Sequence, residues 1–325
     1  MIFKRNKEKV TRIFFATDIH GSEKCFKKFV NAGKFYNVDA LILGGDLTGK
    51  MLVPIVEHGQ TYKYSLFEDN FEAKAEDLPS VEEKIRTMGY YPLITSPKDF
   101  EELSAKPERV HEIFQRLAVE TLKRWVSLAE ERLKDSGIKF YIAGGNDDDE
   151  TVEPILDASE YIVNPEGKVI NFDGKHEMIS SAYSNLTPWK TPRELPEEQL
   201  ERKIQSMIEK LENVKTAIFN LHAPPINSQL DTCVELDTSV YPPKPIFEGG
   251  SPKQYSAGSS AVRNLIEKYQ PLLGLHGHIH ESRGAIYIGR TLCINPGSEY
   301  GEGILRGAII LLEPDKVKSF QLTSG

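Results

Sequence analysis

Five short, mostly apolar runs constrain what this chain can fold into. Each run is rich in β-branched and aromatic residues and stops at a polar or glycine-rich turn. The runs cover residues 13–16, 40–43, 139–142, 216–219 and 272–275. Runs of this length without polar alternation are typical of strands that are buried on both faces of a largely parallel sheet.

Helical patterns of apolar residues lie between these runs. Phe26, Phe29 and Val30 have helical spacing after the first run, and Ser259 or Ser260 could cap a helix before the fifth. Strands that alternate with helices imply crossover connections and a layered α/β fold. Less regular apolar runs between residues 161 and 180 and between 285 and 322 predict further strands, with antiparallel pairing.

Two stretches are longer than a crossover needs. Asp46 and Asn146 are 100 positions apart. Residues 54–67 alternate and turn at His58 and Gly59, which predicts a hairpin, and residues 109–133 have the pattern of one long amphipathic helix. We therefore predict one domain over residues 1–325, with residues 50–106 inserted as a hairpin and helix cap. Residues 223–258, rich in Pro, Gly, Ser and Asp, predict a long loop.

Composition restricts the class of partner and the compartment. The net charge of -8 argues against binding along extended nucleic acid, although a nucleotide held locally is compatible with it. Cys25, Cys233 and Cys293 are scattered without a disulfide or CxxC spacing, which indicates a reducing compartment. The charged N-terminal residues and the short apolar run after them are too short for a signal peptide or a membrane span. We therefore expect a soluble cytoplasmic protein, and no feature indicates an oligomeric state.

Candidate metal ligands follow every one of the five runs. In chain order they are Asp18, His20, Asp46, Asn146, His222, His278 and His280. In open α/β sheets the carboxyl ends of strands line a shared crevice, so these side chains can converge. Residues two apart in an extended chain project to the same side, so each Asp-x-His or His-x-His pair can grip one site. Imidazole and carboxylate ligands suit Zn, Mn or Fe.

The order D-x-H, GD, GN-D, H and GH-x-H resembles the calcineurin-like metallophosphoesterases, over most of the chain. The turn at residues 295–298 is similar to one in bacterial and archaeal members. The resemblance implies a sandwich of two mixed β-sheets flanked by helices. It also implies two divalent transition metal ions, with Mn favoured over Fe or Zn. The implied ligands of one ion are Asp18, His20, Asp46 and His280, and those of the other are Asn146, His222 and His278, with Asp46 bridging both.

The implied activity is hydrolysis of a phosphoester. Two such ions, roughly 3.5 to 4 Å apart, would polarise the phosphate and deliver a bridging hydroxide in line with the leaving group. Asp46 and Asp147 are the catalytic candidates. Many members have a histidine where this chain has Asp147, and members without it more often resemble phosphodiesterases. We therefore expect a small anionic phosphodiester substrate, possibly a nucleotide.

Several alternatives stay open from the sequence. The same site could belong to a phosphomonoesterase or protein phosphatase, and the fold also occurs as a non-catalytic scaffold, whereas the acidic charge disfavours a nuclease. Asp147 with Glu150 could cap a helix and do no chemistry. His276 is expected to be structural, and Asn295 and Ser298 either line the pocket or form a turn.

Overall fold

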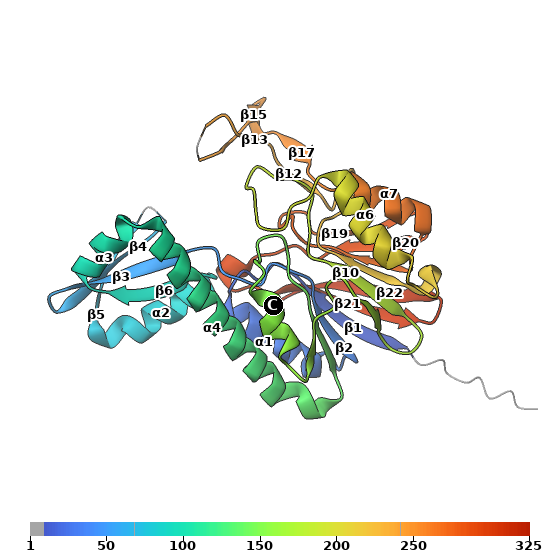
Figure 1. The fold of residues 1–325 in the computed structure, drawn as a ribbon, viewed down its shortest axis with the longest axis horizontal. Coiled ribbons are helices and arrows are strands. Elements are labelled where there is room, and N and C mark those ends of the chain that lie inside the picture. Colours follow the sequence, from blue (N-terminus) through green and yellow to red (C-terminus); the bar gives the residue numbers. More distant parts are fainter. Residues whose placement is uncertain (1–9, 68, 241) are drawn as a thin grey trace, which may run out of the picture.

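Two mixed six-stranded sheets form the body of the protein (Figure 1). The computed structural model describes residues 10–67, 69–240 and 242–325. The charged residues 1–9, which enter the prediction that no signal peptide is present, lie outside the described residues. The predicted α/β sandwich is confirmed, and it is the architecture that the resemblance to the metallophosphoesterases implied.

Four neighbouring strands of the first sheet are parallel to one another. The strand order is β22-β21-β1-β2-β7-β8. Strand β21 is antiparallel to β1, and β22 is antiparallel to β21. The strands are β1 (Thr11–Ala16), β2 (Ala40–Leu43), β7 (Lys139–Ile142), β8 (Ile162–Val163), β21 (Arg306–Glu313) and β22 (Lys316–Ser324). The first three predicted runs are therefore neighbouring strands of one sheet.

The second sheet holds the other two predicted runs. Its order is β19-β20-β18-β11-β10-β9. The strands are β9 (Val169–Asn171), β10 (Glu177–Ser181), β11 (Ile218–Leu221), β18 (Leu273–Leu275), β19 (Gly284–Ile288) and β20 (Thr291–Asn295). The prediction that all five runs share a single sheet is wrong, because the chain leaves the first sheet after β8. The fourth strand also begins two residues late, since a 3-10 turn, η3 (Val214–Thr216), precedes it.

Burial on both faces explains the uniformly apolar strands. Phe15 of β1 packs between the two sheets with residues such as Ile218 and Leu273, whereas its neighbour Phe14 packs under the helices. The first sheet is covered by α1 (Glu23–Phe35), α4 (Pro107–Leu133) and α5 (Val152–Asp157), and the second by α6 (Glu197–Ile208) and α7 (Ser260–Tyr269). Ser259 caps α7 by accepting a hydrogen bond from the Val262 amide. Burying each such phenylalanine contributes roughly 1.5 to 3 kcal/mol.

Residues 52–104 form a separate four-stranded sheet with two helices, beside the sandwich (Figure 1). Its order is β5-β4-β3-β6, and it has its own small core that includes Val53, Ile55 and Ile85. The elements are β3 (Leu52–His58), β4 (Thr61–Leu66), β5 (Asp69–Lys74), η1 (Ala75–Asp77), α2 (Leu78–Thr87), β6 (Tyr91–Thr95) and α3 (Pro97–Ser104). The predicted hairpin and the long helix, α4, are confirmed. The role of this insert as a cap stays a prediction.

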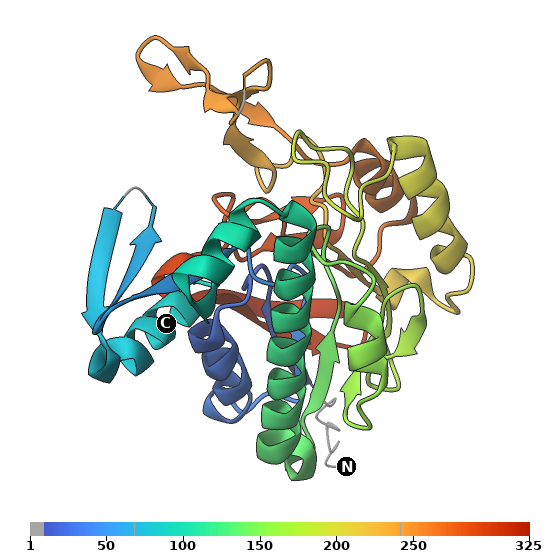
Figure 2. The ribbon, with the colours of Figure 1, turned by 60° about the vertical axis from the view of Figure 1, so that its left-hand side comes forward.

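The segment predicted as a long loop, residues 223–258, is not a plain loop. It contains three two-stranded ribbons that extend away from the body as an arm (Figure 2). The pairs are β12 (Thr232–Val234) with β17 (Gln254–Ser256), β13 (Leu236–Asp237) with β14 (Lys244–Pro245), and β15 (Phe247–Glu248) with β16 (Ser251–Pro252). Gly249 and Gly250, both with positive φ, reverse the chain at one tip, so the glycines that suggested a loop serve a tight turn.

None of the helices in the described part of the chain combines the length and the apolar character needed to cross a bilayer. The longest, α4, has 27 residues but carries charged side chains along its length.

Candidate metal centre

The ends of β1, β2, β7, β11 and β18 bring the seven predicted ligands into one place. Donor atoms of Asp18, His20, Asp46 and His280 lie within 4.8 Å of one another. Donor atoms of Asp46, His222 and His278 form a second group within the same limit. Asp46 belongs to both groups, the position that the resemblance implied for a bridging carboxylate. Their role as metal ligands stays a prediction, but their convergence is a property of the fold.

The two oxygens of Asp46 face different groups. Its Oδ2 lies 3.5 Å from His20 Nε2, and its Oδ1 lies 3.4 Å from His222 Nε2. Asn146 joins the second group, because its Oδ1 is 2.7 Å from Nδ1 of His278. On the other side, Oδ1 of Asp18 is 3.4 Å from His280 Nε2. The residues thus form two adjacent groups of donor atoms that share the Asp46 carboxylate.

Several buried nitrogen atoms in this cluster have no hydrogen-bond partner. Nδ1 of His20 and Nε2 of His222 are both buried without one. Nε2 of His20 faces Nε2 of His280 at 3.0 Å, an arrangement in which at most one proton can be shared. Buried polar atoms are normally paired, so such orphans indicate a missing partner. A cation that accepts these lone pairs supplies it, and the N and O donor set fits Zn, Mn or Fe.

The backbone at the cluster is held in an uncommon conformation. Asp18, His20, Asp46 and His278 have φ of 53°, 38°, 50° and 67°, in the left-handed region that non-glycine residues rarely adopt. Backbone bonds hold it there, since the Asp18 amide donates to Gly45 O and the His20 amide to Asp46 O, both at 2.9 Å. Strain of this kind concentrates at functional sites, where the surrounding fold enforces it.

The charges of the cluster are interdependent. Burial alone would raise the pKa of Asp18, but the hydrogen bond with His280 and the charge of His222 outweigh it and lower that pKa to about 2. Burial opposes a charge on His222, yet Asp46 raises its pKa to about 9. Burial lowers the pKa of His278 to about 4. The protein groups alone therefore keep Asp18 ionised and favour a proton on His222. That proton supplies the positive charge that a bound cation would supply.

Asp148 is a site residue that the sequence analysis missed. Its side chain is fully buried and accepts hydrogen bonds from the amides of Leu47, Thr48 and Gly145 at 2.8 to 2.9 Å and from the Thr48 hydroxyl at 2.7 Å. Burial and the charge of Asp46 raise the pKa of Asp148, although these bonds oppose the shift. Asp148 thus joins the loop after β2 to the loop after β7, which carry Asp46 and Asn146.

Asp147 does not cap a helix, so that alternative is wrong. The helix α5 begins at Val152, and Asp149, not Asp147, accepts the hydrogen bond from the Thr151 amide. The carboxylate of Asp147 instead forms an ion pair with Lys50 and lies 3.8 Å from Nδ1 of His20. Lys50 is the second site residue that sequence reasoning missed, because a lysine at the start of an insert has no motif of its own.

Asn146 is oriented by the segment of residues 184–195. Its Nδ2 donates to Thr191 Oγ1 at 2.8 Å, which turns Oδ1 toward His278. The Arg193 amide donates to the Asn146 carbonyl, and the buried Arg193 side chain donates to the carbonyl of Asp148 and pairs with Glu153. This support is a third feature that no sequence pattern indicated.

The remaining polar candidates are structural. Asn295 is fully buried, and its Nδ2 donates to Ile279 O at 3.0 Å, while Ser298 Oγ donates to Asp18 O at 2.6 Å. Residues 295–298 are therefore a turn that braces two ligand loops. His276 is buried with Nδ1 2.9 Å from Leu221 O and is structural, as predicted. His58 is exposed at the end of β3.

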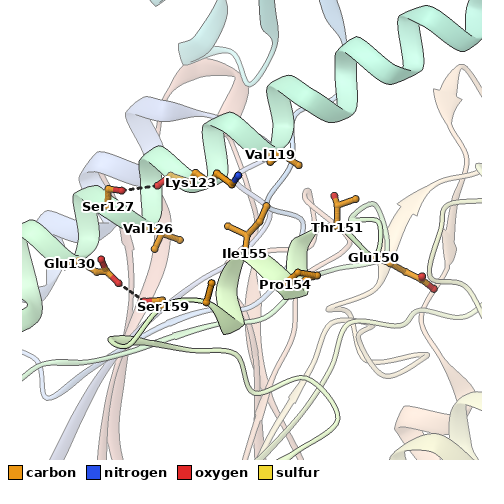
Figure 3. Close-up of a pocket in the computed structure, with 11 residues that line it drawn as sticks. Val119, Lys123, Val126, Ser127, Glu130, Glu150, Thr151, Pro154, Ile155 and Ser159 are labelled. Atoms are coloured by element: carbon orange, nitrogen blue, oxygen red, sulfur yellow. Dashed lines mark hydrogen bonds between the residues drawn. The ribbon is translucent and has the colours of Figure 1, made fainter.

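A cavity of about 300 Å³ opens in front of the cluster. Its polar side is formed by Asp46, Lys50, Asn146, Asp147, His278 and His280. A larger hollow of about 800 Å³ lies between α4 and α5, where Figure 3 shows apolar side chains such as Val126 and Ile155 and the hydrogen bond from Ser159 to Glu130. None of the predicted ligands lines that hollow, so the chemistry is assigned to the smaller cavity.

Metal addition is expected to stabilise the protein. A ligand at a hundred times its Kd that binds only the folded state stabilises it by about 2.7 kcal/mol. For metal-stripped protein we therefore expect saturating Mn²⁺ or Zn²⁺ to raise the Tm by roughly 5 °C or more. Differential scanning calorimetry with EDTA as the reversal measures this, and His278→Ala serves as the control that should lose part of the shift. A Tm that is unchanged by Mn²⁺, Zn²⁺ and Fe²⁺ contradicts the ligand assignment.

The sequence has a partial match among curated proteins and matches no family model. An uncharacterized protein of Methanocaldococcus jannaschii is 30% identical over 149 residues, 45% of this chain and 59% of that relative, so the chain matches about six tenths of the relative's length.

Solved structures align with almost the whole chain. The TT1561 protein of Thermus thermophilus has a TM-score of 0.50 at 15% identity, covering 98% of this chain and 99% of that one. A dimetal phosphatase from Danio rerio has a TM-score of 0.42 at 6% identity, covering 97% and 98% of the two chains. The likeness to TT1561 shows a shared fold.

Proposed function

We infer that this chain is a calcineurin-like metallophosphoesterase, a hydrolase of phosphoesters that works with two divalent metal ions. The observation that carries the inference is the position of Asp46, whose two oxygens face two separate groups of histidine and carboxylate donors. Two-metal phosphoester hydrolases hold their ions about 3.5 to 4 Å apart, and one carboxylate shared by two groups of ligands suits that spacing.

Each of the seven residues has a place in the proposed centre. Asp18, His20 and His280 would hold one ion, Asn146, His222 and His278 the other, and Asp46 both. Two bound divalent ions would supply positive charge to the phosphate oxygens and a strong nucleophile at neutral pH. Asp148 keeps the two loops that carry Asp46 and Asn146 together, and Thr191 keeps the Asn146 oxygen turned toward His278.

Lys50 offsets the negative charge of Asp147 next to the proposed substrate. A carboxylate such as Asp147 beside an anionic substrate repels it unless its charge is offset. In this structure Lys50 pairs with Asp147 at the edge of the cavity and offsets that charge. The small anionic phosphoester substrate that we propose is therefore compatible with the carboxylate.

We further propose that the preferred substrate is a phosphodiester. A diester carries one negative charge at phosphorus, whereas a monoester carries nearly two at neutral pH, because its second pKa is about 6. The extra charge would lie near the Lys50–Asp147 ion pair, which has no net charge to stabilise it, whereas a histidine of other members would favour it. The aspartate at this position supports the diester over the monoester, which is the alternative with the same centre.

A pair of chromogenic substrates tests the diester proposal. With Mn²⁺ supplied, we expect kcat/KM for bis-p-nitrophenyl phosphate to exceed that for p-nitrophenyl phosphate by about tenfold, equivalent to about 1.4 kcal/mol. A preference for the monoester would favour the phosphatase alternative. No hydrolysis of either ester, together with less than one bound metal per chain after reconstitution, would favour the scaffold.

The identity of the metal and the compartment are also proposals. Manganese is proposed for the pair of ions, and metal analysis of the purified protein tests it. All three cysteines are free thiols, and Cys25 and Cys293 are buried. Free thiols support a reducing compartment, so we propose the cytoplasm as the site of action.

A further inference from the structure

Two large apolar side chains stand exposed beside the metal centre. Leu186 is 62% exposed and Trp189 is 59% exposed, and both line the cavity in front of the predicted ligands. Pro188 lies between them on the same wall. Tryptophan is normally buried to a large extent. A tryptophan that is exposed at a cavity does not stabilise the core, and such residues mark binding sites.

The loop that carries Trp189 is held in place at both ends. Glu194 accepts hydrogen bonds from the Thr187 amide at 2.9 Å and from the Thr191 amide at 2.8 Å. Ser184 and Arg193 pair through their backbones at 3.0 Å. Thr191 also receives the hydrogen bond from Asn146, so the loop is tied directly to a predicted ligand. The indole is thus presented from a fixed loop at a set place relative to the centre.

A second wall of the cavity comes from the arm. Cys233 and Tyr255 are register partners in the β12–β17 ribbon and line the same cavity as Trp189. Tyr255 is 38% exposed, so its ring is also available to a ligand. Two aromatic side chains from distant segments therefore border one space whose floor is the metal centre.

The size and charge of the cavity restrict what can lie against these walls. Its volume of about 300 Å³ is at the lower end of small-molecule pockets, so it holds a small organic group and not a whole long acyl chain. Lys50 is the only basic side chain among the described lining residues other than the histidines, and it is paired with Asp147. Glu281 adds a carboxylate to the lining, so the organic part of the substrate is small and carries no negative charge, and the indole and phenol suit a flat ring with polar edges.

We propose that the cavity binds nucleotide diesters, with the phosphate at the metal centre and a nucleobase stacked on Trp189. The proposal rests on the phosphoesterase function proposed above. Stacking of a base on an aromatic side chain contributes about 1 to 3 kcal/mol by alanine substitution and tolerates any base, because each has a flat aromatic face. Trp189 is in this view a specificity residue that selects the organic group and takes no part in bond cleavage.

Two esters with the same leaving group test the stacking. Thymidine 5′-(p-nitrophenyl phosphate) carries a base, and ethyl p-nitrophenyl phosphate does not. We expect Trp189→Ala to lower kcat/KM for the thymidine ester by roughly tenfold and to leave the ethyl ester within about twofold, whereas Trp189→Phe, which keeps a flat ring, should retain most of the preference. Equal losses for both esters with Trp189→Ala would overturn the proposal.

Tryptophan fluorescence separates this proposal from the enzymatic one, because it needs no turnover. The chain has two tryptophans, and Trp125 is buried in a stack with Phe26. In metal-loaded protein we expect thymidine 5′-monophosphate to quench the emission and ribose 5-phosphate to leave it unchanged, and Trp189→Phe to remove the quench. Quenching without cleavage of either ester would refute the phosphoesterase function and leave the base site standing. Cleavage without quenching would refute the base site alone.

Discussion

Replacing Asp46 by asparagine is expected to lower kcat by at least about a hundredfold, equivalent to nearly 3 kcal/mol of transition-state stabilisation. The carboxylate has one oxygen toward His20 and the other toward His222, and it also accepts a hydrogen bond from the Asp147 amide at 3.0 Å. An amide keeps one oxygen and replaces the other by an NH2 group, which cannot act as a ligand. The variant should therefore offer a ligand oxygen to only one of the two metal sites.

The measurement combines steady-state kinetics with metal analysis of the same preparation. Asp46→Asn should bind fewer than two ions per chain after reconstitution. Asp147→Asn is the matched control, because it makes the same chemical change one residue from Asn146 at the edge of the cavity, and we expect a much smaller loss of rate. Wild-type turnover by Asp46→Asn with two ions bound would show that Asp46 is not the bridge.

The second large effect is on stability. Asp148→Ala is expected to lower the free energy of unfolding by about 4 kcal/mol, because three buried amides and one hydroxyl lose their acceptor and each unsatisfied group costs roughly 1 to 3 kcal/mol, with partial compensation by water. The donors belong to Leu47, Thr48 and Gly145. Urea unfolding followed by circular dichroism gives the change. Metal affinity should fall as well, since the two loops that Asp148 joins carry Asp46 and Asn146.

Asp135→Ala is the control for that experiment, because Asp135 is an exposed aspartate in the 3-10 turn η2 (Lys134–Ser136), directly after α4. Exposed substitutions of this kind usually change stability by less than about 0.5 kcal/mol. If Asp148→Ala costs no more than Asp135→Ala, the buried carboxylate does not hold the loops together.

Much of the fold and of the candidate site follows from local sequence, for a physical reason. Strands that are buried on both faces are apolar at every position, so the residues where they end stand out as polar. Asp18, Asp46 and His222 stand out in this way from the sequence alone. Within each sheet the convergence of these residues follows from parallel strands that end at the same edge, and the packing of the two sheets brings both edges together at one cluster.

Features that depend on contacts between distant segments were not predictable. Nothing in the apolar runs of β1 and β11 tells which sheet each will join, because that choice depends on how the two sheets pack against each other. The ribbons of the arm are two or three residues long, too short for an alternating pattern. Lys50, Asp148 and Arg193 act through partners about 40 to 100 positions away, so no local motif could indicate them.

The position of the insert has a consequence for how such a protein can diversify. The strands β2 and β7 are direct neighbours in the first sheet, and α4 alone is long enough to connect them. The unit at residues 52–104 is therefore spliced into a crossover that is already complete, and it packs around its own core. Its first residues follow within a few positions of Asp46. No described residue of the unit lines the cavity, so its exchange for another would leave every strand that presents a ligand in its place, and the insert can change while the chemistry is inherited unchanged.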